Sequence, residues 1–331
     1  MAYEEWNFAQ ENLVQVDHLS IRFPLRNGQW IRPVDDVSFN VQPGEVLALV
    51  GESGSGKTTI GRSLLRILEP TAGTIRVGGR DITHIRGRQL AEYRRQAQMI
   101  FQDPFASLNP VKTVENHLLF PIRKHQGIDA RRAGSMMDEL LNRVGLTPAQ
   151  ETRTKYPHEL SGGQRQRLAI ARALAVQPRF LVADEPISML DVSIRAGILK
   201  LLNELKTEFR LSFLYITHDL ASARYFGDRI MVLYAGKVME TATSRELVRS
   251  PRHPYTRLLL AATPGSAHVG PLPQKNNEPP DLNEGRHGCP FASRCLSATQ
   301  ECFETMPPMT KVGPGHHVAC YHPYTGYDEI L

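Results

Sequence analysis

The sequence lacks long hydrophobic runs. None of its 331 residues belongs to an apolar stretch near the ~18–20 residues that a helix needs to cross a bilayer, so we expect no membrane span. Met1–Trp6 is neither basic nor apolar, which argues against a secretory signal. The sequence also lacks a strong excess of one sign of charge, because it has 39 Lys and Arg and 34 Asp and Glu. This balance gives no indication of nucleic-acid binding. The sequence predicts a cytosolic chain, or one held at a membrane only by partners.

Cysteine is missing from residues 1–288, and all four cysteines follow within a short segment: Cys289, Cys295, Cys302 and Cys320. In a cytosolic chain such a cluster favours a metal site over disulfides, although a disulfide pair stays an alternative. The spacing lacks the paired C-x2-C units typical of structural zinc, and four thiolates suit either Zn²⁺ or a [4Fe–4S] cluster. Flanking histidines keep a mixed zinc site open: His287, His316, His317 and His322.

The apolar content of 41% is typical of a globular protein, and the length suggests roughly two domains. Residues 12–50 predict several strands, and residues 88–176 are mostly helical in pattern. Short apolar runs predict buried strands, and helices are expected at 58–68 and 194–209; the strands are Val46–Val50, Phe180–Ala183 and Phe213–Ile216. Strands that alternate with helices indicate an α/β fold with a largely parallel sheet. From about Thr263, prolines among polar residues predict a linker.

Gly51–Thr58 fits the pattern G-x-x-x-x-G-K-[ST] and lies between a predicted strand and a predicted helix. Glycines let backbone N–H groups turn toward phosphate oxygens, and the helix N-terminus adds a favourable dipole. Lys57 is expected to reach the β- and γ-phosphates, and the Thr58 hydroxyl is expected to bind Mg²⁺. The sequence therefore predicts a nucleotide-binding phosphate loop.

Two later strands end in polar residues that fit the same site. Asp184 and Glu185 follow an apolar strand, and His218 ends the next one. Carboxylates at the end of a parallel strand can face bound phosphates. We expect Asp184 to hold Mg²⁺, Glu185 to act as general base toward water, and His218 to contact the γ-phosphate.

Leu160–Arg167 opens a helix, with Ser161 suited to an ordinary N-cap. These residues also resemble the signature motif of ATP-binding cassette (ABC) proteins. The other motifs of that family follow in order: Gln102 resembles the Q-loop glutamine, Ser188–Asp191 the D-loop, and His218 the switch histidine. Phe23 stands where the family places the aromatic residue that stacks on adenine. Met189 stands where the family usually has Ala in the D-loop. Because Asp191 is retained, we expect little effect on the chemistry, and the departure leaves only the fine tuning of dimer contacts open. The resemblance covers roughly residues 12–250.

The resemblance implies an α/β fold of the P-loop NTPase ABC type, with a RecA-like parallel-sheet core, an antiparallel β edge and a helical subdomain. The nucleotide-binding domain is expected over residues 10–262, with the helical subdomain at about 88–165. Residues 263–331 would form the Pro-rich linker and a Cys-rich C-terminal extension.

The resemblance also implies the binding residues. Those for ATP are Phe23, Gly51, Ser53, Gly54, Ser55, Gly56, Lys57, Thr58, Thr59, Gln102 and Asp184. Those for Mg²⁺ are Thr58, Gln102 and Asp184, and those for catalysis are Glu185, His218, Gln102 and Lys57. Residues that complete the site of a partner subunit in a head-to-tail dimer are Ser161, Gly162, Gly163, Gln164 and Asp191.

Ser107–Pro110, Arg252–Thr256 and the late cysteines resemble the dipeptide/oligopeptide branch of this family. That branch implies an importer ATPase on the cytoplasmic face of the inner membrane. Its partners would be a second ATPase subunit in a heterodimer, two permeases and an extracytoplasmic solute-binding protein, with no nucleic acid. The branch also favours a [4Fe–4S] cluster on the four cysteines over Zn²⁺. The branch favours peptides as the transported solute, and nickel, glutathione or oligosaccharides are alternatives. A soluble ABC ATPase acting on nucleic acid or ribosomes is the more distant alternative.

Overall fold

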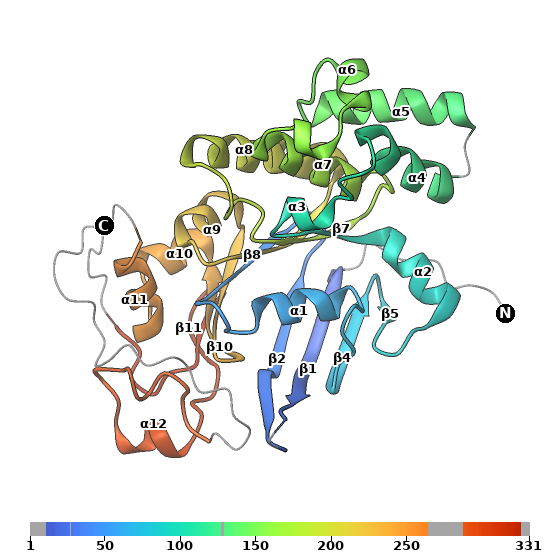
Figure 1. Ribbon diagram of the computed structural model, residues 1–331. Helices are drawn as coiled ribbons and strands as arrows, with labels where there is room; N and C mark the ends of the chain where they lie inside the picture. Colours follow the sequence, from blue (N-terminus) through green and yellow to red (C-terminus); the bar gives the residue numbers. More distant parts are fainter. Residues whose placement is uncertain (1–10, 27, 127–128, 264–286, 326–331) are drawn as a thin grey trace. The chain divides into compact units, whose positions relative to one another are not determined.

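A computed structural model describes residues 11–26, 28–126, 129–263 and 287–325. The chain divides into two compact units (Figure 1). Unit 1 combines Met1–His84 with Leu214–Leu331, and unit 2 is Ile85–Phe213. Among the described residues, no helix combines the length and the apolar character that a bilayer crossing requires.

Unit 1 contains an antiparallel sheet in the order β2-β1-β4-β5. Its strands are β1 (Val14–Pro24), β2 (Trp30–Val41), β4 (Ala72–Val77) and β5 (Arg80–Asp81). Inward and outward side chains alternate along much of β1, where Val14, Val16 and Leu19 are buried. This alternation is typical of a sheet with one face on the core. This sheet forms the antiparallel edge that was expected from residues 12–50.

The second set of strands in unit 1 runs in the order β11-β12-β10-β9-β3-β8. They are β3 (Val46–Val50), β8 (Ser212–Thr217, which enters from unit 2), β9 (Arg229–Tyr234), β10 (Lys237–Thr243), β11 (Thr310–Gly313) and β12 (His316–Val318). Strand β3 is parallel to β9, and β10, β12 and β11 continue antiparallel. Every residue of β3 is buried, as expected for a strand that is covered on both faces. The helices of this unit are α1 (Lys57–Leu64), α9 (Leu220–Phe226), α10 (Ser244–Arg249), α11 (Pro254–Ala261) and α12 (Gln300–Glu304).

The C-terminal segment 287–325 joins this sheet through β12, which pairs with β10. Glu240 on β10 is fully buried and binds both sides of the junction. Its carboxylate accepts the backbone N–H groups of Arg252 (2.7 Å) and His253 (2.9 Å), and it lies 2.7 Å from Nε2 of His316. A buried carboxylate with three partners is well satisfied, so it fixes the segment on unit 1.

Unit 2 contains β6 (Ala97–Ile100) and β7 (Phe180–Asp184), which pair in parallel. All five residues of β7 are buried. Helices make up most of the unit (Figure 1): α2 (Gly87–Gln96), α3 (Pro104–Ser107), α4 (Val114–Gln126), α5 (Ala130–Arg143), α6 (Ala149–Thr154), the 3₁₀ turn Pro157–Glu159, α7 (Gly162–Leu174) and α8 (Val192–Phe209).

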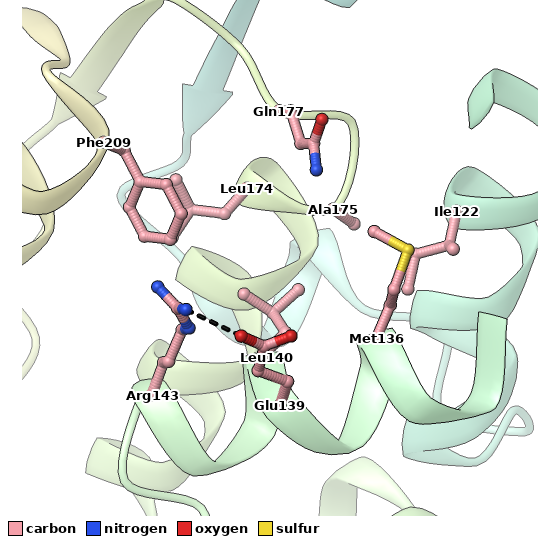
Figure 2. A pocket seen from close by; sticks show the side chains of 9 residues that line it. All are labelled: Ile122, Met136, Glu139, Leu140, Arg143, Leu174, Ala175, Gln177 and Phe209. Carbon is pink, nitrogen blue, oxygen red and sulfur yellow. Dashed lines mark hydrogen bonds and ion pairs between the residues drawn. The ribbon is translucent and has the colours of Figure 1, made fainter. Parts of the chain in front are cut away.

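A pocket lies among α4, α5, α7 and α8 of unit 2 (Figure 2). Its walls are mainly apolar, with Leu140, Leu174 and Phe209 among them. The ion pair between Arg143 and Glu139, 2.7 Å, stands at its edge. The guanidinium of Arg143 also lies over the ring of Phe209, 5.1 Å from its centroid. No motif found in the sequence contributes to these contacts.

One local expectation was wrong. The helix expected over 58–68 ends at Leu64, and Arg66 takes a positive φ of 55°, which a continuing helix does not allow. The region 88–176 is mostly helical as expected, and it also contains the short strand β6 at residues 97–100, which was not predicted. The strands expected at 46–50, 180–183 and 213–216 are present, extended by at most one residue at an end. The prolines of the expected linker, 264–280, lie outside the described residues.

Candidate nucleotide site and cysteine cluster

The phosphate loop connects β3 to α1 in unit 1. Gly56, the N-cap of α1, has a φ of +103°, and a Cβ there would lie 2.0 Å from the carbonyl oxygen of Pro33. At Gly51 a Cβ would lie 2.1 Å from the carbonyl oxygen of Leu233. Only glycine fits at these two positions. Their backbone can therefore turn N–H groups toward a bound phosphate.

Lys57 is buried at the start of α1, and only 5% of its surface is exposed. Its Nζ donates to the carbonyl oxygens of Gly51 (2.7 Å) and Glu52 (2.8 Å). The first turn of α1 contains no acidic residue. The buried ammonium and the N-terminal end of the helix dipole together favour an anion in this loop. A site of this charge and shape fits the phosphates of a nucleotide.

Unit 2 brings two predicted catalytic residues together. Nε2 of Gln102 donates to Oε2 of Glu185 at 3.3 Å. Glu185 directly follows Asp184, the last residue of β7. Asp184 is buried, with 3% of its surface exposed. The backbone of Glu185 has a φ of +46°, a conformation uncommon for non-glycine residues. Such strain concentrates at functional sites, and here it occurs at the residue that Gln102 contacts.

The signature residues form the N-terminus of α7, also in unit 2. Ser161 and Gln164 make a reciprocal capping box. Gln164 N–H donates to Oγ of Ser161 (3.3 Å), and Ser161 N–H donates to Oε1 of Gln164 (2.9 Å). A Cβ on Gly163 would lie 2.9 Å from a methyl carbon of Ile194, so a small residue is needed there. Both sequence interpretations of Ser161 are compatible with this geometry, because Ser161 is an N-cap and is also exposed.

Other predicted residues lie at the ends of elements. In unit 1, His218 is exposed after β8, and the next residue, Asp219, caps α9 by accepting from Ala221 N–H at 2.9 Å. Phe23 is half-buried on β1 of the same unit. In unit 2, Asp191 is the exposed N-cap residue of α8.

The four cysteines of the C-terminal segment line one cavity in unit 1. None of these four described cysteines forms a disulfide, so the disulfide alternative is not realised. Burial, with a contribution from the neighbouring cysteines, raises the pKa of Cys289 to about 12 and that of Cys320 to about 11. Thiols that are this resistant to ionisation need a strong positive partner to become ligands. Within the described residues, no three His, Cys, Asp or Glu side chains converge on a point suited to one metal ion.

One contact at the phosphate loop was not predicted. Arg294, which precedes Cys295, forms a bidentate ion pair with Glu52 of the loop, with distances of 2.8 and 3.0 Å. Burial opposes its charge, but hydrogen bonds to Glu52 and to the hydroxyl of Tyr234 (3.1 Å) raise the pKa of Arg294 above its usual value. Tyr255 also contacts the loop, because its hydroxyl accepts the N–H of Glu52 at 2.9 Å. In the sequence, the only feature that could have pointed to these contacts was the motif Arg252–Thr256, which contains Tyr255.

Comparison with known proteins decides the family. The profile described as "ABC transporter" matches residues 34–188, and that described as "Oligopeptide/dipeptide transporter, C-terminal region" matches residues 239–302. The oligopeptide transport ATP-binding protein AppF of Bacillus subtilis is 42% identical over 94% of this chain and 98% of its own length. The chain belongs to the ABC transporter family. A Brucella ovis protein described as a peptide import ATP-binding protein, BOV_A0347, is 44% identical over 93% of this chain and 97% of its own.

Solved ABC cassettes share the fold. The ATP-binding cassette MJ0796, in a dimeric post-hydrolysis state bound to ADP and Pi, superposes with a TM-score of 0.64 and 29% identity. The match covers 70% of this chain and 99% of that one. CbiO1 from Clostridium perfringens, part of the ABC transporter complex CbiONQ, gives a TM-score of 0.63 and 27% identity over 72% of this chain and 91% of its own. This chain is thus an α/β ABC ATPase, and its reaction is ATP hydrolysis.

Proposed function

We propose that this ABC ATPase powers the uptake of di- or oligopeptides. The observation that carries the proposal is the pairing of a phosphate loop with a C-terminal region of the oligopeptide/dipeptide transporter type in one chain. Relatives similar over nearly their whole length are described as oligopeptide transport and peptide import ATP-binding proteins, which supports the same solute class.

We assign the steps of hydrolysis to residues of both units. The Lys57 ammonium, which now binds the carbonyl oxygens of Gly51 and Glu52, would turn to the β- and γ-phosphates of ATP. Thr58, Gln102 and Asp184 would hold Mg²⁺ through oxygen atoms, as this hard cation prefers. The loop residues that would contact phosphates are Gly51, Ser53, Gly54, Ser55, Gly56, Lys57, Thr58 and Thr59.

Glu185 would accept a proton from the attacking water, and Gln102 would orient the Glu185 carboxylate through the 3.3 Å hydrogen bond. His218 would contact the γ-phosphate, and Phe23 would stack on the adenine ring. Ser161, Gly162, Gly163, Gln164 and Asp191 would complete the ATP site of a second ATPase subunit. In this arrangement ATP holds two cassettes together, and hydrolysis separates them.

The proposal includes two permeases, a second and different ATPase subunit, and an extracytoplasmic solute-binding protein. It places the chain at the cytoplasmic face of the membrane, attached through the permeases. Residues 10–262 would form the nucleotide-binding domain, with the subdomain at about 88–165 docking on the permeases. Residues 263–331 would form the C-terminal extension.

We further propose that Cys289, Cys295, Cys302 and Cys320 hold a [4Fe–4S] cluster. The four thiols line one cavity, and no three ligand side chains in the described segments converge on one ion. A single tetrahedral zinc ion needs sulfur atoms about 2.3 Å from one centre, whereas an iron–sulfur cube spreads its ligands over a larger volume. The resemblance of the late cysteines to the dipeptide/oligopeptide branch supports the cluster over zinc. When bound, the cluster would cross-link a segment that is too short to build a core of its own.

Co-purification tests the proposed transporter. The tagged chain is isolated anaerobically from detergent-solubilised membranes, and the proteins that accompany it are identified by mass spectrometry. Two multi-span permeases and a second cassette subunit are expected. The complex is then placed in proteoliposomes with its solute-binding protein, and ATP should drive uptake of a labelled dipeptide. Uptake of a nickel chelate, glutathione or an oligosaccharide instead would contradict the proposed solute class. Recovery of the chain only with ribosomes or nucleic acid would contradict the proposed role in an importer.

A further inference from the structure

The phosphate loop of this chain contains an acidic residue, Glu52, at a place that has to receive a polyanion. Glu52 lies next to the lysine that binds phosphate, because its carbonyl oxygen accepts from Lys57 Nζ at 2.8 Å. A carboxylate so close to an anion site repels phosphate, and it can also compete with phosphate for the lysine ammonium.

Arg294 pairs with that carboxylate through both of its terminal nitrogens, at 2.8 and 3.0 Å. The Arg294 side chain is 7% exposed and that of Glu52 is 32% exposed, so water screens the pair only partly. The bidentate geometry fixes the direction of the Glu52 carboxylate, and the guanidinium neutralises its charge.

The surroundings of Arg294 are built to hold it there. Its guanidinium lies 5.6 Å from the ring centroids of both Tyr234 and Phe291, and it donates to the Tyr234 hydroxyl at 3.1 Å. The rings of Tyr234, Tyr255 and Phe291 pack against one another, with centroids 4.6 to 5.4 Å apart. Because the Tyr255 hydroxyl also accepts the N–H of Glu52, this aromatic cluster contacts the backbone of the same loop residue.

We propose that Arg294 is a positioning residue of the ATP site: it neutralises Glu52 and holds its carboxylate away from Lys57. The C-terminal segment thereby sets the affinity of the phosphate loop for MgATP. This inference rests on the ATP-binding role proposed for the loop, and it does not depend on which metal the cysteines bind.

The test is a titration of the full, nucleotide-free chain with a fluorescent ATP analogue and Mg²⁺. In Arg294→Gln the uncompensated carboxylate should raise the Kd about tenfold at low salt, and high salt should reduce that rise by screening. Arg294→Lys keeps the charge and should stay within about threefold of the wild type. Glu52→Gln alone removes the carboxylate that balances the Arg294 guanidinium, so the loop gains net positive charge and the Kd should fall by about threefold.

The double variant Arg294→Gln/Glu52→Gln separates a charge role from a packing role. If Arg294 acts on the charge of Glu52, the double variant should bind MgATP within about threefold of the wild type. If Arg294 only packs the segment, the double variant should bind as weakly as Arg294→Gln, and the proposal is overturned. Arg257→Gln is the matched control, because Arg257 lies over the ring of Tyr324 in the same segment, 3.9 Å from its centroid, and should bind MgATP like the wild type.

Thermal melts of each variant show whether it is folded before its affinity is compared. A wild-type chain that fails to bind MgATP would contradict the proposed function itself. A wild-type chain that binds, together with a folded Arg294→Gln variant of equal affinity, would overturn this inference alone.

Discussion

Gln102 and Glu185 are 83 residues apart in the sequence, and Nε2 of Gln102 donates to Oε2 of Glu185 at 3.3 Å. Glu185 directly follows the buried strand β7, and its backbone has a positive φ of 46°. A general base needs a defined orientation toward its water, and a neutral amide donor supplies one without removing the negative charge. The 3.3 Å contact supports the roles proposed for this pair, with Glu185 as general base and Gln102 as the residue that orients it.

Glu185→Gln should strongly slow ATP hydrolysis and preserve ATP binding. Loss of the general base is expected to slow phosphate release by about a hundredfold or more in the assembled complex, while ATP stays bound. Phosphate release and filter retention of labelled ATP measure the two effects. Glu204→Gln, a change at an exposed ion pair on α8, is the control and should hydrolyse ATP like the wild type. Wild-type turnover in Glu185→Gln would show that another residue, or the partner's site, carries the reaction.

Ser161→Ala should destabilise the start of α7. Its hydroxyl accepts the Gln164 N–H in the capping box, and loss of such a cap costs about 1 kcal/mol of unfolding free energy. Denaturant unfolding of the full chain measures the change. Ser135→Ala is the matched control, because Ser135 lies inside α5 and its hydroxyl bonds only weakly to the Arg131 carbonyl at 3.4 Å. Equal stability of the two variants would contradict the capping role.

The buried strands could be predicted from the sequence because their residues are apolar without interruption, as in Val46–Val50. The phosphate loop could be predicted because its pattern G-x-x-x-x-G-K-[ST] is contiguous in the sequence. The close approach of Pro33 and Leu233 backbone atoms, which requires glycine at Gly56 and Gly51, is visible only in the folded chain. Strand β6 was missed because only four residues, Ala97–Ile100, follow directly on a helical pattern. The Arg294–Glu52 pair joins residues 242 apart and follows no periodicity, so only the folded chain reveals it.

His253 should make stability depend on pH. Burial lowers its pKa to about 4, against a smaller opposing effect of Glu240, and its Nδ1 must stay unprotonated to accept the Tyr255 N–H at 3.0 Å. The unfolded chain binds a proton near pH 6.5, so this stabilisation is complete above that pH and is lost as the pH falls toward 4. The loss over this window is up to about 3 kcal/mol.

Denaturant unfolding at a series of pH values tests the role of His253. His253→Asn keeps an acceptor for the N-cap of α11 but does not titrate. Its unfolding free energy should therefore fall less steeply than that of the wild type between pH 6.5 and 4. Identical slopes for the two chains would show that His253 does not contribute to the acid sensitivity of this protein.

Cys295→Ser should affect two sites at once. As one of four proposed ligands, Cys295 is needed for a complete cluster, so anaerobically purified wild type should contain about four iron and four sulfide per chain and the variant far less. Because Arg294 is the preceding residue, a displaced Cys295 should also move the guanidinium from Glu52 and raise the MgATP Kd toward that of Arg294→Gln. Adding Cys295→Ser to Arg294→Gln should then cause no further loss of affinity. If the purified wild type contains zinc and no iron, the proposed cluster is wrong and the cysteines hold zinc instead. If Cys295→Ser loses iron but binds MgATP with unchanged affinity, the cysteines do not influence the phosphate loop.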